Sequence, residues 1–228
     1  MLAFDDCVEP VTDVLGARGA SILPRRTDPD PSEFLTPLLD GADAVLAARA
    51  VRVLVMRRTA PGVVERLPPW VESPDPRVAR AAVLAANELT NADIARIGGP
   101  LVRAARGGVE GVAWPACSAL SRVANDEPVA RDALLAVADD PANSAQVAVA
   151  PFLVALGTPG LERIVRFLEH PSRDARRNAC VTLLPIARRD GGNREALASA
   201  TPALDRLAAS DDLEMARLAK DVLTAIRR

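Results

Sequence analysis

The stretch VARAAVLAANEL, from Val78 to Leu89, carries apolar side chains at offsets 4, 7, 8 and 11 from its first residue. This spacing places those side chains on one stripe of a helix with 3.6 residues per turn. The same frame recurs five more times along the chain. Its offset-4 residues, separated by 32, 34, 33, 30 and 40 positions, are Ala50, Ala82, Ala116, Val149, Ala179 and Ala219. A period of this length predicts an array of stacked helical units.

A second, shorter apolar helix is expected before each of these helices. Five such segments are 63–71, 97–105, 129–138, 161–168 and 197–207. Each repeat is therefore predicted to be a hairpin of an outer and an inner helix. One hairpin gains roughly 10 kcal/mol from apolar burial, less than the backbone entropy of about thirty residues at about 1–2 kcal/mol each. The sequence thus predicts an all-α, right-handed α-solenoid of about six hairpins that stabilise one another.

Three turn-plus-helix phrases carry a resemblance to a known family: SPDPRVARAAVLAANEL, EHPSRDARRNACVTLLPIA and SDDLEMARLAKDVLTAI. They resemble HEAT repeats of the short bacterial type, also called phycobilin-lyase-like repeats, over about residues 32–228. The resemblance implies the fold and says little about function, because the shared residues are core and turn residues. Tetratricopeptide and ankyrin arrays fit less well, since the chain has no Tyr and repeats no TPLH-type turn.

Residues 1–31 fall outside the repeat and contain three prolines near their end. We expect an N-terminal arm or cap over 1–31 and the HEAT-like solenoid over 32–228. The favoured role of the arm is to cap the first hairpin. A segment lying in the groove and a mobile tail remain open.

Prolines inside the repeats predict local breaks. Pro68 and Pro69 should bend or shorten the outer helix of the second repeat. Pro151 falls in the middle of the fourth inner helix, at offset 6, and predicts a kink there.

Composition narrows the possible functions. The formal net charge is −2, which indicates no global attraction to nucleic acid or anionic membranes. The first residues carry acids where a signal peptide needs bases, and no apolar run is long enough to span a membrane. The three cysteines form no C-x-x-C pair, so a reducing, cytoplasmic location is the simplest interpretation.

Catalytic motifs are absent from the sequence. The single histidine, His170, lies in a predicted turn, so the His/Glu metal array of the HEAT-repeat enzyme deoxyhypusine hydroxylase cannot be assembled. No phosphate-binding loop or G-x-S-x-G motif occurs. The sequence therefore predicts no catalytic residue, cofactor or metal, and a non-enzymatic role is favoured.

The inner helices are expected to line the concave side of the solenoid, with offsets 2, 5, 6 and 9 facing a groove. This groove has an apolar middle and a row of arginines, a combination that suits a peptide or helix bearing carboxylates. The predicted groove residues are Arg80, Val83, Leu84, Asn87, Trp114, Cys117, Ser118, Ser121, Val147, Pro151, Val154, Arg177, Val181, Leu184 and Arg217.

The leading hypothesis is a protein-interaction scaffold or adaptor that binds a protein segment in this groove. The structural alternative is that neighbouring inner helices bury most of these residues, with Trp114 filling a gap instead of anchoring a partner. The functional alternative is a small-molecule binder or cofactor-poor enzyme, with a pocket formed by Trp114, Cys117, Cys180, Arg80 and Arg177. A nucleic-acid partner, as in the HEAT-like alkylpurine DNA glycosylases, is disfavoured by the apolar middle of the groove.

Overall fold

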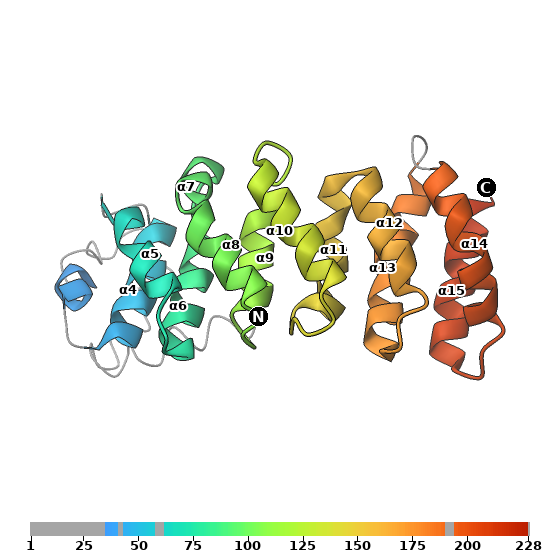
Figure 1. The fold of residues 1–228 in the computed structure, drawn as a ribbon, viewed down its shortest axis with the longest axis horizontal. Helices are drawn as coiled ribbons and strands as arrows, with labels where there is room; N and C mark the ends of the chain where they lie inside the picture. The colour runs from blue at the N-terminus through green and yellow to red at the C-terminus, as the bar shows by residue number, and fades with distance from the viewer. Residues whose placement is uncertain (1–34, 41–42, 58–61, 190–193, 228) are drawn as a thin grey trace. The chain divides into compact units, whose positions relative to one another are not determined.

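A computed structural model describes residues 35–40, 43–57, 62–189 and 194–227 of the 228-residue chain. Every regular element in these ranges is a helix, which confirms the all-α fold class (Figure 1). The chain divides after Arg103 into two compact units, and each is considered by itself. The predicted arm over 1–31 lies outside the described residues, and the predicted hand of the solenoid stays a prediction. Among the described helices, none combines the length and the apolar character needed to cross a membrane.

The first unit holds two hairpins and the start of a third. In this unit α6 packs against both α4 and α5, and η2 packs against α4. Its elements are η2 (Thr36–Asp40), α4 (Ala44–Arg57), η3 (Val64–Arg66), α5 (Leu67–Val71), α6 (Pro76–Ala86), α7 (Asn91–Arg96) and the beginning of α8 (Gly98–Arg106). The outer helix α5 is only five residues long and has Pro68 in its first turn, in line with the predicted shortening at Pro68 and Pro69.

The second unit consists of stacked hairpins. Its inner helices pack in the order α9, α11, α13, α15, and its outer helices in the order α10, α12, α14 (Figure 1). Its elements are α9 (Ala113–Ser121), α10 (Pro128–Asp139), η4 (Gln146–Ala148), α11 (Ala150–Leu153), η5 (Val154–Leu156), α12 (Thr158–Phe167), α13 (Arg173–Arg188), α14 (Arg194–Ala208) and α15 (Leu213–Ile226).

The predicted apolar stripe forms the core of both units. All six offset-4 residues are 0% exposed: Ala50, Ala82, Ala116, Val149, Ala179 and Ala219. A small side chain at this position lets helices approach closely where they cross. The rotational phase of the inner helices is therefore the one predicted from the repeat.

Pro151 disrupts the fourth inner helix more strongly than the predicted kink. The segment breaks into η4, α11 and η5. Proline has no N–H to donate to the carbonyl four residues earlier, which belongs to Val147. Instead, Nδ2 of Asn178, from α13, donates to the Val147 carbonyl oxygen at 2.9 Å. A side chain of the next repeat thus supplies the hydrogen bond that the proline cannot make.

We predict that Asn178→Ala lowers the free energy of unfolding by about 1–3 kcal/mol, because it leaves the Val147 carbonyl without this donor. In a Pro151→Ala background the restored N–H can donate to that carbonyl, so the cost of Asn178→Ala should fall by more than half. Urea unfolding followed by circular dichroism measures the free energies of unfolding that make up this double-mutant cycle. Asn125→Ala, at an exposed turn position, serves as control and should change stability by less than about 0.5 kcal/mol. An equal cost of Asn178→Ala in both backgrounds would contradict this account.

Candidate functional site

The predicted groove residues of the first unit all lie on or just after α6. Arg80 is exposed, Leu84 and Asn87 are half-buried, and Val83 is 0% exposed. The Asn87 side chain donates from Nδ2 to the Val83 carbonyl oxygen at 3.0 Å. The amide therefore holds the end of its own helix, and the outward-facing groove residues of this unit are Arg80 and Leu84.

The structure corrects the prediction that Val83 and Cys117 face the groove, because both are 0% exposed and belong to the core. They occupy offset 5, which is also fully buried at Val51, Ala150 and Cys180. Inner helices such as α13 and α15 pack side by side, and the flank of a helix in such a contact is removed from solvent. In α15, the last described inner helix, the same offset holds the exposed Lys220. Offset 5 therefore faces a neighbouring helix instead of the groove.

Offsets 2, 6 and 9 form an accessible surface on the inner helices of the second unit. We call this set the inner surface; its predicted members, all exposed or half-buried, are Trp114, Ser118, Ser121, Val147, Pro151, Val154, Arg177, Val181, Leu184 and Arg217. Trp114, Val154 and Val181 are 47%, 37% and 46% exposed. Large apolar side chains at these levels of exposure mark an interaction surface when they occur close together.

Trp114 does not fill a gap in the core. Its ring packs against Phe152 of α11, with centroids 5.4 Å apart and an angle of 53° between the planes, while nearly half of the side chain faces solvent. A tilted aromatic pair of this kind fixes the orientation of both rings. Phe152 was missed by the sequence prediction because its offset, 7, was assigned to the core.

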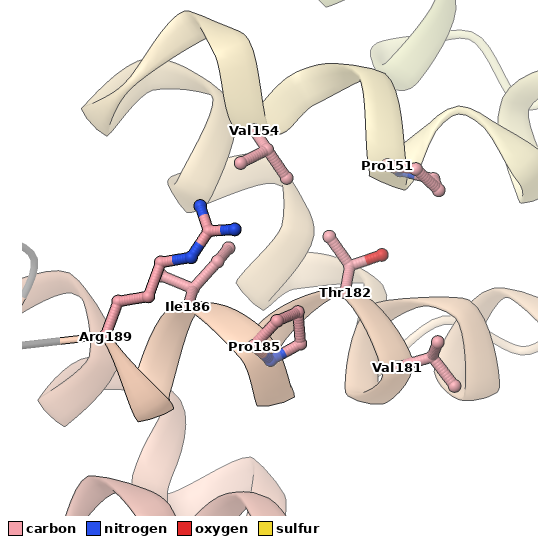
Figure 2. A pocket seen from close by; sticks show the side chains of 7 residues that line it. All are labelled: Pro151, Val154, Val181, Thr182, Pro185, Ile186 and Arg189. Atoms are coloured by element: carbon pink, nitrogen blue, oxygen red, sulfur yellow. The ribbon is translucent and has the colours of Figure 1, made fainter.

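An open cavity of about 310 Å³ lies between α11, η5 and α13 (Figure 2). It is lined by Pro151, Val154, Val181, Thr182, Pro185, Ile186 and Arg189. The sequence predicted Pro151, Val154 and Val181 as groove residues and missed the other four. Along α13, Val181, Pro185 and Arg189 are spaced four residues apart and so lie on one face of the helix. Extending the predicted offset-6 stripe by two helical turns would therefore have identified Pro185 and Arg189.

One arginine of the predicted row, Arg177, is engaged in an ion pair within the second unit. Arg177 of α13 pairs through Nε with Glu214 Oε1 of α15 at 2.8 Å. Arg173 binds Asp212 at 2.6 Å and Glu214 at 2.7 Å. Hydrogen bonds from Arg173 and from the Met215 backbone N–H lower the pKa of Asp212 to about 2. By contrast, no ion pair involves Arg189 or Arg217 within the described residues.

Cys117 and Cys180 are buried, and His170 is held by hydrogen bonds. Burial raises the pKa of Cys117 to about 12 and that of Cys180 to about 11, so neither thiol ionises at neutral pH. His170 accepts a hydrogen bond at Nδ1 from the Ser172 N–H at 3.0 Å, and its Nε2 lies 3.2 Å from Gln146 Oε1. In the part of the chain that the structure describes, no three His, Cys, Asp or Glu side chains gather as a metal site would require. Because both side chains are fully buried, neither Cys117 nor Cys180 presents its thiol to an open pocket.

The elements and their packing define an all-α helical repeat protein. No family of known proteins matches the sequence, and no curated protein matches it. Solved structures do match. One engineered protein is 20% identical over 87% of this chain and 99% of its own, with a TM-score of 0.58.

Two other structural matches are designed armadillo repeat proteins. One, in complex with the peptide (KR)4, is 18% identical over 86% of this chain and all of its own, with a TM-score of 0.56. The other, computationally designed for modular peptide recognition, is 21% identical over 84% of this chain and 98% of its own, with a TM-score of 0.51. At these identities the matches support the repeat fold alone.

We predict that Cys117 and Cys180 react slowly with Ellman's reagent in the folded protein, because both thiols are buried and protonated. In a Cys7→Ser variant at pH 8, labelling should be at least roughly a hundredfold slower than in denaturant. A thiol introduced by Val181→Cys, next to Cys180 but on the inner surface, should react rapidly. Fast labelling of Cys117 without denaturant would contradict its placement in the core.

Proposed function

We propose that the protein is a non-enzymatic interaction module, built of HEAT-like repeats over residues 32–228, that binds a segment of a partner protein. The binding site proposed is the inner surface of the second unit. The observation that carries this proposal is the exposure of Trp114, Val154 and Val181, the last two of which line an open, mostly apolar cavity. Exposed aromatic and aliphatic side chains around a cavity are the usual anchors of a protein interface.

The geometry of the inner surface suits a peptide. Its residues come from successive helices α9, α11 and α13, which are neighbours in the second unit. An extended segment lying across such helices can place alternate side chains in successive contacts. Of the designed armadillo repeat proteins described above, one is in complex with a peptide and the other was designed for modular peptide recognition. Peptide binding is proposed for this chain as well.

Binding of a small apolar molecule is a second candidate function. One observation favours it: the cavity volume of about 310 Å³ is at the lower end of the range found for ligand pockets, about 300–1,000 Å³. Native mass spectrometry of the gently purified protein tests this alternative through any small ligand that is retained.

The proposal predicts that a displayed random-peptide library, selected on the full chain, yields peptides whose affinity depends on the inner surface. Trp114→Ala and Val181→Asp should each weaken such peptides at least tenfold, as expected when an interface anchor is removed or a charge is placed in an apolar contact.

Val129→Asp provides the matched control, because Val129 is also an exposed valine of the second unit, 62% exposed, but lies at the start of α10. It should leave peptide affinity within twofold of that of the unchanged protein, by the small effect expected away from an interface. Equal losses for Val129→Asp and Val181→Asp, or a library that yields no specific peptide, would reject the proposal.

A further inference from the structure

The cavity beside α13 has one charged lining residue, Arg189; the others are apolar except for Thr182. Figure 2 shows the Arg189 guanidinium reaching across the cavity toward Val154, above Ile186. The Thr182 hydroxyl already donates to the Asn178 carbonyl oxygen at 2.7 Å, within its own helix. Among the described residues no carboxylate pairs with Arg189. The side-chain polar group that can select a ligand here is therefore the guanidinium.

Several other arginines of the second unit have carboxylate partners. On α13 itself, Arg173 binds Asp212, and Arg177 binds Glu214. Arg163 of α12 binds Asp139 of α10 at 3.2 Å. Arg189, at the end of α13, has its charge beside apolar side chains instead. A guanidinium in this position complements a ligand that carries a carboxylate next to an aliphatic group.

The backbone at the cavity adds a second recognition element. Pro185 lies inside α13 and has no N–H to donate to the carbonyl of Val181, the residue four positions earlier. Both residues line the cavity. The Val181 carbonyl thus lacks its usual helical donor, and a peptide N–H can take that place. This feature favours a polypeptide ligand over a purely apolar molecule.

Resting on the proposed peptide-binding function, we infer that the cavity is a specificity pocket for an acidic, aliphatic peptide segment. One Leu, Ile or Val side chain enters between Val154, Val181 and Ile186. The carboxylate of an adjacent Asp or Glu binds the Arg189 guanidinium. The partner is thereby defined by chemistry: an internal segment in which an aliphatic residue is followed by an acidic one.

Methyl-labelled full-length protein and two synthetic peptides test this inference. The peptides are acetyl-AALDAA-amide and acetyl-AALNAA-amide, which differ in one side-chain charge. The acidic peptide should shift the methyl resonances of Val154, Val181 and Ile186 and should bind about threefold to fivefold more tightly than the neutral one. That range is what an exposed ion pair contributes.

Arg189→Gln should abolish this preference by reducing the affinity for the acidic peptide to that for the neutral peptide. Arg188→Gln is the matched control: Arg188 is the exposed neighbour outside the cavity, and its replacement should leave the preference intact. Loss of the preference in both variants would overturn the assignment to Arg189, because long-range charge would then explain it.

Two further results would overturn the inference. Equal affinity of the two peptides, with the same methyl shifts, would remove the carboxylate from recognition but leave the proposed peptide binding intact. An absence of shifts at the three methyl-bearing residues would show that the cavity is not the specificity pocket. In that case the library selection on Trp114 and Val181 variants still decides the proposed function independently.

Discussion

The structure depends on the close crossing of helices at one small residue per repeat. The six offset-4 positions are fully buried, and five of the six are alanine. This contact fixes the rotation of every inner helix about its own axis. Once that rotation is set, offset 5 of α6, α9 and α13 is buried, and offsets 2, 6 and 9 of the inner helices in the second unit face solvent. The inner surface and its cavity are therefore consequences of how tightly the core is packed.

In the second unit, ion pairs connect neighbouring repeats. Within each layer of helices, the acid and the base come in the same order along the chain. Between outer helices, Asp139 of α10 accepts from Arg163 and Arg166 of α12, so the acid precedes the base. Between inner helices, Arg173 of α13 binds Asp212 beside α15, so the base precedes the acid. Exposed pairs of this kind add little stability individually. Because the acid comes first between outer helices and the base comes first between inner helices, the pairs together favour one alignment of adjacent hairpins over others.

Much of the fold could be predicted from the sequence, because the recurring apolar positions show directly which face of each inner helix is buried. Periodicity within one helix does not show which neighbour covers its flank, so Val83 and Cys117 were assigned to the surface although they are buried. The extent of the break at Pro151 depends on Asn178, which lies in the next repeat and gives no local signal. Arg189 lies beyond the repeated frame, and its place at the cavity follows only from the length of α13.

The central claim is that all inner helices share one rotation about their axes. This rotation buries the offset-4 position and exposes the offset-6 position, two residues away. Equilibrium unfolding of Ala179→Leu and Val181→Leu tests it most directly, since the two sites are on one helix and differ in phase. Ala179 is 0% and Val181 46% exposed. The account predicts that Ala179→Leu lowers the free energy of unfolding by about 1–3 kcal/mol, because of overpacking. Val181→Leu should change it by less than about 0.5 kcal/mol. Equal effects of the two substitutions, or a larger effect at Val181, would contradict it.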